Sequence, residues 1–195
     1  MKKDLHKILN NILKIIIIVT IVIKLAISNY ENIGMLILAF LLTHYEIILN
    51  RLFKIKLNNL NNLLIVLFIF LAQYLGSCLN FYDLFSWWDI MLHFVSGIIM
   101  FLIGIDLYTL INKKQQGTRV LTMLLFAVFF ALAIGNLWEI WEYTTDAILK
   151  LDSQKAGELV GRLALKDTMT DLIASASGTV LILVFKVLKL RGERK

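Results

Sequence analysis

Near the end of a long apolar run, the sequence reads Gly135-Asn136-Leu137-Trp138-Glu139-Ile140-Trp141-Glu142-Tyr143-Thr144-Thr145-Asp146. The run begins near Val120. It is longer than a membrane-spanning helix requires, which is about 20 mostly apolar residues. Helix positions i, i+4, i+7 and i+11 share a face, and here they hold Gly135, Glu139, Glu142 and Asp146. Ionisable side chains in a membrane helix cost free energy and face a partner or a cavity. The stretch therefore predicts a membrane helix whose polar face meets other helices of the chain.

The whole chain has the composition of a polytopic membrane protein. Of its 195 residues 59% are hydrophobic, whereas the apolar share of a soluble domain is about 45–50%. Blocks long enough to span a membrane lie at about 9–28, 33–52, 61–80, 88–111, 120–147 and 167–189. We predict an all-α fold, a single transmembrane bundle over residues 1–195 with six transmembrane helices. The lone Cys78 excludes an intramolecular disulfide.

The first block has an alternative interpretation as a cleaved signal peptide. Basic residues precede it, and Ala26-Ile27-Ser28 loosely resembles a signal-peptidase site. We favour a retained first span, because Lys24 interrupts the block where a cleavable peptide is apolar or small.

The charge distribution predicts the orientation of the chain. Fifteen of the 20 Lys and Arg residues fall in 1–14, 51–56, 113–119 and 186–195, which lie on one side of a six-span chain, and ten of the 14 acids lie on the other side. Since cytoplasmic loops are rich in Lys and Arg, we predict that both termini lie inside. No nucleic-acid motif is present, so we expect membrane lipids as partners and no nucleic acid.

This topology brings three polar helix ends to the outer side of the membrane. The fourth span begins with Asp89 and His93 and the sixth with Asp167 and Asp171, each pair four residues apart, while the fifth ends with the Glu139 face. At about 1.5 Å per residue, the second member of each pair and Glu139 lie one to two turns below the surface. We therefore expect the three polar faces to meet at a similar depth.

Small residues on the same helices should let them approach closely. Ala127, Ala131 and Gly135 recur at four-residue spacing, Gly97 lies one turn beyond His93, and the last span contains the small run 174–178. Such patterns allow close backbone contact between membrane helices.

The clustered carboxylates and the imidazole predict a site for a divalent cation. Around one histidine stand up to six acids: Asp89, Glu139, Glu142, Asp146, Asp167 and Asp171. Arg162 and Lys166 could offset two of these charges. They lie in a connection that we interpret as an interfacial segment, because it contains Leu159, Val160, Leu163 and Leu165. The remaining acids must be solvated, protonated or bound to a cation. Carboxylates with one imidazole suit Mg, Mn, Ca or Zn. We expect metal ligands from Asp89, His93, Glu139, Asp167 and Asp171, with Glu139 or Glu142 as a catalytic base.

Simpler roles stay open for several of these residues. Asp89 and Asp167 stand at helix N-termini, where a carboxylate caps N–H groups, and Asp146 could be solvated beyond its span. A hydrogen-bonded cluster that only joins the helices would give the same pattern. Further polar residues within spans are His44, Glu46 and Gln73, and Glu46 could pair with Arg51 near the inner surface.

The motifs resemble those of known membrane protein families. Asp89-Ile90-Met91-Leu92-His93-Phe94 resembles the Asp-x-x-x-His-Phe signature of the VanZ-like proteins. The chain resembles more closely the YjdF-type inner membrane proteins (the DUF2238 group), which combine this helix with a Trp-Glu-x-x-Glu-Tyr helix, here 138–143, and an Asp-Thr-x-x-Asp helix, here 167–171. The resemblance covers about residues 83–180 and implies that the protein is a multi-pass protein of the cell (inner) membrane. VanZ-like proteins are associated with resistance to glycopeptide antibiotics at the cell surface, which extends to this chain by analogy alone.

Three functions from different classes fit these features. The first is an outward-facing divalent-cation site that binds or processes a lipid or cell-envelope head group; as an enzyme, the protein would be a metal-dependent hydrolase or transferase. The second is a cation- or proton-coupled transporter, which needs polar residues across the bilayer. The third is a non-catalytic membrane scaffold whose acidic surface docks a partner. We favour the first because Asp89, His93, Glu139 and Asp171 converge.

Overall fold

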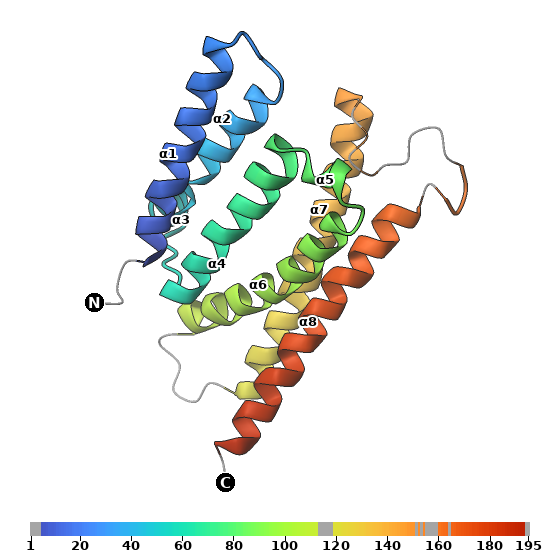
Figure 1. Cartoon of the computed structure of the whole chain (residues 1–195). Coiled ribbons are helices and arrows are strands. Elements are labelled where there is room, and N and C mark those ends of the chain that lie inside the picture. The colour runs from blue at the N-terminus through green and yellow to red at the C-terminus, as the bar shows by residue number, and fades with distance from the viewer. Residues whose placement is uncertain are drawn as a thin grey trace. The chain divides into compact units, whose positions relative to one another are not determined.

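The computed structural model describes residues 5–112, 119–150, 152, 154, 160–163 and 165–193, and within these residues every regular element is a helix (Figure 1). This confirms the predicted all-α class. The chain divides into two compact units, Met1–Trp88 and Asp89–Lys195. The predicted interfacial segment lies partly outside the described residues, since 155–159 and 164 are not among them.

Each unit is built from consecutive helices. The first contains α1 (Leu5–Ala26), α2 (Ile33–Leu42), α3 (Tyr45–Phe53), α4 (Asn59–Ile69), the π-helix η1 (Phe70–Cys78) and the short α5 (Phe81–Leu84). The second contains α6 (Trp88–Ile111), which begins at the boundary, α7 (Val120–Leu149) and α8 (Lys166–Gly192).

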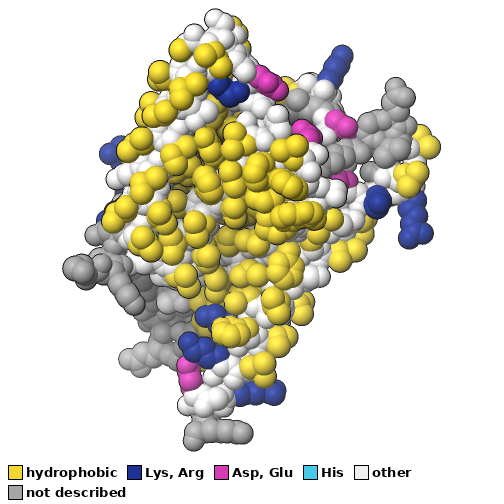
Figure 2. Space-filling view, viewed as in Figure 1, with side chains coloured by type: hydrophobic (Ala, Val, Ile, Leu, Met, Phe, Trp, Pro, Cys, Tyr) yellow, Lys and Arg dark blue, Asp and Glu magenta, His cyan; other side chains and the backbone are white. Residues whose placement is uncertain are grey.

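Within the part of the chain that the structure describes, five helices are long and apolar enough to cross a membrane: α1, the continuous Asn59–Cys78 helix, α6, α7 and α8. The bent pair α2 and α3 makes a sixth span if it is counted as one. Hydrophobic side chains cover much of the surface visible in Figure 2, and many of the large ones are exposed. Apolar surface of this extent suits helices that face lipid. The side of the membrane on which the termini lie stays a prediction.

The second predicted span, 33–52, is not one continuous helix. α2 and α3 meet at an angle of 51° across Thr43 and His44. No proline or glycine occupies the break, which is why the sequence did not reveal it. Local side-chain bonds accompany the bend instead: the Thr43 hydroxyl donates to the Phe40 carbonyl oxygen at 2.6 Å, and His44 Nδ1 lies 3.0 Å from that same oxygen. Threonine bonding to the preceding turn is a known cause of bent helices.

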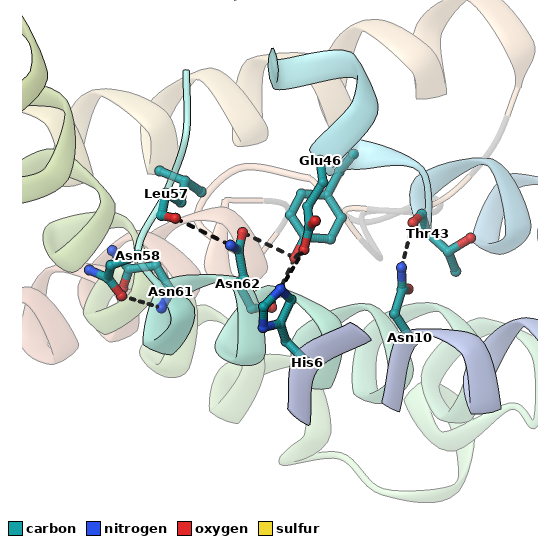
Figure 3. A network of polar contacts seen from close by, with 9 residues as sticks. His6, Asn10, Thr43, Glu46, Leu57, Asn58, Asn61 and Asn62 are labelled. Atoms are coloured by element: carbon teal, nitrogen blue, oxygen red, sulfur yellow. Dashed lines mark hydrogen bonds and ion pairs between the residues drawn. The ribbon is translucent and has the colours of Figure 1, made fainter. Parts of the chain in front are cut away.

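A side chain from α1 satisfies the backbone at this break. Asn10 Nδ2 donates to the Thr43 carbonyl oxygen at 2.8 Å, and Figure 3 shows the two residues facing each other. In a membrane, irregular backbone persists only where its polar groups find partners inside the protein. Asn10 therefore stabilises the broken conformation of the second span.

Replacing Asn10 by leucine should destabilise the first unit by about 1–2 kcal/mol, because the Thr43 carbonyl loses its donor in a buried position. Asn11→Leu is the matched control, since Asn11 is the next residue on the same helix and is exposed. Thermal unfolding in detergent, followed by circular dichroism, compares the two variants. Equal melting temperatures for both variants would contradict this role for Asn10.

The helix that follows changes from α to π geometry at Phe70. In η1 each turn is wider, and Leu79 N–H bonds to the Tyr74 carbonyl oxygen, five residues earlier, at 3.1 Å. Gly76 accommodates the neighbouring α5, because a Cβ there would lie 2.5 Å from the ring of Tyr82. A hydrogen bond of 2.9 Å between the hydroxyls of Tyr74 and Thr20 links η1 to α1.

The second unit is held together by small residues, as the sequence predicts. A Cβ on Gly97 would overlap the Ser175 carbonyl oxygen, and one on Gly178 would overlap the Phe94 carbonyl oxygen. The backbones of α6 and α8 are therefore in direct contact, and Thr179 Oγ1 donates to the Gly97 carbonyl oxygen at 3.3 Å. This glycine contact is the closest kind of helix packing that membranes allow.

The helix α7 also packs against α6 and α8 through small residues. A Cβ on Gly135 would lie 2.9 Å from Ser175 Oγ, and one on Gly104 would lie 2.9 Å from the Cα of Ala127. Below these contacts an apolar core forms around Phe101, Leu124, Ala127 and Ala131. We call the contact residues the small-residue seam: Gly97, Gly104, Ala127, Gly135, Ser175 and Gly178. The seam brings the polar ends of α6, α7 and α8 together.

Candidate carboxylate–histidine site

A first group of predicted residues meets between α6 and α7. His93, Glu139 and Glu142 each offer a ligand atom, and these atoms lie within 4.8 Å of one another. Glu139 and Glu142 project from the same side of α7 because they are three residues apart. His93 Nδ1 is 3.7 Å from Glu139 Oε1, which is an ion-pair distance and too long for a hydrogen bond.

A second group meets between α6 and α8. Asp89, Asp167 and Asp171 also offer ligand atoms within 4.8 Å of one another. Asp89 lies one turn before His93 on α6, and His93 Nε2 is 3.6 Å from Asp89 Oδ1. The imidazole ring of His93 thus has one nitrogen beside each group. The six residues together form the carboxylate–histidine cluster: Asp89, His93, Glu139, Glu142, Asp167 and Asp171.

The deepest members of the cluster are almost completely buried. The exposed fraction is 8% for His93, 5% for Glu139 and 2% for Asp171. Among the described residues, neither carboxylate oxygen of Glu139 has a hydrogen-bond partner, and Asp171 Oδ1 has none either. Buried polar atoms are nearly always satisfied, and a buried charge without a partner is very costly.

Helix capping and solvation were the simpler roles considered for Asp89, Asp167 and Asp146. Asp89 and Asp167 are half-buried and lie in the first turns of α6 and α8, where the helix dipole favours a carboxylate. Leu165, and not an acid, is the N-cap of α8, and it makes no side-chain cap bond. Asp146 is not part of either group; its Oδ2 accepts a hydrogen bond from the Gln154 backbone N–H at 3.0 Å.

The sequence analysis suggested that two basic residues could offset part of the cluster's negative charge. Arg162 and Lys166 are both exposed. Asp89 and Asp167 each have a polar or electrostatic interaction within the protein. Compensation of the cluster's charge by Arg162 and Lys166 stays a prediction.

Gln154 is a neighbour of the cluster that the sequence did not reveal. Its Nε2 donates to Thr168 Oγ1 at 2.9 Å and to the Glu139 carbonyl oxygen at 3.4 Å, so it links α7 to α8. A glutamine in a long connection gives no periodic signal, and only the folded chain places it here.

The first unit contains a separate polar network that the sequence analysis also missed (Figure 3). Glu46 pairs with His6, whose Nε2 lies 3.1 Å from Glu46 Oε1, and not with Arg51 as predicted. Tyr45 donates to the Asn62 carbonyl oxygen at 2.9 Å and to Glu46 Oε1 at 3.3 Å. His6 and Asn10 are four residues apart and both buried, so a helical-spacing search that included the start of the first span could have found them.

Comparison with known proteins agrees with the membrane class. The model of the family described as "Predicted membrane protein (DUF2238)" matches residues 9–192. A protein of Thermotoga maritima, described as an uncharacterized protein, is 36% identical over 111 residues, which are 56% of this chain and 53% of that protein. The chain thus matches about half the length of this relative. No solved structure matches the chain.

Proposed function

Because the chain belongs to the DUF2238 family of predicted membrane proteins, we propose that its carboxylate–histidine cluster binds a divalent cation. The bound cation serves to bind or process a lipid or cell-envelope head group. In the predicted orientation the cluster lies in the outer leaflet, within reach of such groups. The similarity of its motifs to the VanZ-like proteins adds an analogy to an envelope function and no more than that.

One observation carries this proposal: the buried carboxylate of Glu139 has two unsatisfied oxygens beside an imidazole nitrogen. A cation at this position would supply the missing partner for both oxygens at once. Carboxylate oxygens with one imidazole nitrogen suit a hard or borderline ion such as Mg, Mn, Ca or Zn.

The surrounding residues suit hydrolysis or transfer on a phosphorylated head group. A bound divalent ion polarises a phosphoryl oxygen and lowers the pKa of bound water. Glu142 is half-buried and close to His93 and Glu139, so it can accept a proton from an attacking water or hydroxyl. Asp89 can orient the imidazole of His93 through the nitrogen that faces away from Glu139.

The metal content of the purified protein tests the proposal. We expect the wild-type chain, equilibrated with Zn²⁺ or Mn²⁺ in detergent and freed of unbound ion, to retain at least one ion per chain. His93→Ala and Glu139→Gln should each lower the retained amount at least tenfold. Asp83→Asn should change nothing, because Asp83 is an exposed acid on α5. An ion-free wild type, or full retention by both cluster variants, would refute the cation site.

A cation- or proton-coupled transporter is the second candidate, and the break between α2 and α3 favours it. Discontinuous membrane helices are typical of transporter binding sites, and the polar network of His6, Asn10 and Glu46 lies beside this break. The buried apolar residues Leu13, Ile17 and Leu36 separate this network from the next polar contact on α1, at Thr20. Because the described residues of this core are apolar along α1 between Asn10 and Thr20, we rank the transporter second. Cation flux into proteoliposomes that Glu46→Gln abolishes would reverse the order.

A further inference from the structure

We propose that the carboxylate–histidine cluster holds two cations, in adjacent positions of different ligand chemistry. This inference rests on the proposed function, because it subdivides the same cluster. The first position is formed by His93, Glu139 and Glu142, and the second by Asp89, Asp167 and Asp171.

The ligands form two neighbouring sets of three, which meet where His93 Nε2 lies 3.6 Å from Asp89 Oδ1. Within each set the three ligand atoms lie within 4.8 Å of one another, and no residue belongs to both sets. The first set joins α6 to α7, and the second joins α6 to α8. His93 lies between them, with Nδ1 beside Glu139 and Nε2 beside Asp89.

Each set contains its own buried carboxylate with an unsatisfied oxygen. In the first set it is Glu139, which is 5% exposed; in the second it is Asp171, which is 2% exposed. A single ion at either position would satisfy the oxygens of one set and leave those of the other without a partner. Both carboxylates are more than nine-tenths buried, so bulk solvent does not reach these oxygens.

The charge of the cluster accommodates two divalent ions. The two sets contain five carboxylates, and two divalent ions offset four of the negative charges that these carry when all are ionised. Asp89 and Asp167 lie in the first turns of α6 and α8, where the helix dipole also favours negative charge.

The ligand types differ between the two positions. The first set offers one imidazole nitrogen and two carboxylates, which suits a borderline ion such as Zn²⁺ or Mn²⁺. The second set offers carboxylate oxygens alone, which suits a hard ion such as Mg²⁺, Ca²⁺ or Mn²⁺. Mn²⁺ fits both positions and is therefore the ion to count.

Mn²⁺ binding to the full-length chain in detergent tests the inference, with equilibrium dialysis to give the stoichiometry and electron paramagnetic resonance to detect neighbouring ions. The wild type should bind two Mn²⁺ and show the broadened signal of two ions close together. Glu142→Gln and Asp167→Asn should each bind one ion and show the six-line signal of isolated Mn²⁺. Asp83→Asn should bind two.

Different failures have different meanings in this experiment. One ion in the wild type that both variants lose would mean one shared position, which overturns the two-cation inference and keeps the proposed function. No ion in the wild type would overturn both. Two ions that neither variant loses would place the ions elsewhere and would also overturn the inference. Zn²⁺ competition adds a further check, since Zn²⁺ should displace Mn²⁺ more readily from Asp167→Asn than from Glu142→Gln.

Discussion

Replacing Gly178 by alanine is expected to lower the free energy of unfolding by about 3 kcal/mol or more, although it adds only one methyl group. Overpacking a well-packed core costs about 1–3 kcal/mol when side chains can adjust. At Gly178 the added Cβ overlaps a backbone oxygen, that of Phe94, which no side-chain rotation can move. The helices α6 and α8 must therefore separate, and the hydrogen bond from Thr179 to the Gly97 carbonyl would be strained with them.

The matched control for this variant is Gly34→Ala. Gly34 lies in the first turn of α2, and nothing lies within 4 Å of a Cβ built there. Alanine has the higher helix propensity, so this control should be neutral or more stable by up to about 1 kcal/mol. The stability of both variants is measured by unfolding with increasing SDS in mixed micelles, with tryptophan fluorescence as the signal. Similar unfolding midpoints for the two variants would show that the glycine contact between α6 and α8 is not essential.

The second large effect concerns the stability of the double variant Glu139→Gln/Asp171→Asn relative to the wild type, which we expect to change sign when a divalent cation is added. In a chelator this variant should be more stable than the wild type by about 2 kcal/mol, since it removes the charge of two buried carboxylates whose oxygens lack hydrogen-bond partners. A saturating divalent cation should stabilise the wild type, by about 2.7 kcal/mol at a hundred times its dissociation constant. The same cation should leave the double variant unchanged, so the order of stability inverts.

Thermal unfolding of the wild type and the double variant, each in EDTA and in excess Mn²⁺, gives the four melting temperatures that this comparison needs. Asp83→Asn is the charge-matched control and should follow the wild type in both conditions. If the cluster served only to join the helices, the double variant would be the less stable protein in both conditions. This experiment therefore separates a cation site from a structural role without any knowledge of the substrate.

Helical periodicity was enough to predict most of the cluster. Asp89 and His93, like Asp167 and Asp171, are four residues apart, and that spacing alone puts each pair on one face of its helix. The small residues at Gly97, Gly135 and 174–178 indicated the helix contacts that bring these faces together. The division into two ligand sets depends on helix rotation and side-chain conformation, which no residue spacing encodes.

The features that the sequence did not predict depend on partners far away along the chain. The break at Thr43 has no proline or glycine, and its donor, Asn10, is 33 residues away. Glu46 has Arg51 five residues away, yet it pairs with His6 from another helix. The π-helical turns of η1 follow an ordinary apolar pattern that α-helices share. In each case tertiary contacts outweigh the local signal.

The small-residue seam has a consequence for the ionic radius that the cluster accepts. A frame in which the α6 and α8 backbones touch at Gly97 and Gly178 cannot widen to lengthen the distances between ligands. Small ions such as Mg²⁺ need bonds of about 2.0–2.1 Å, whereas Ca²⁺ needs about 2.3–2.6 Å and more ligands. Rigid packing one to two turns from the ligands should therefore favour ions of one size, so that the glycines contribute to ion selection although they touch no ion.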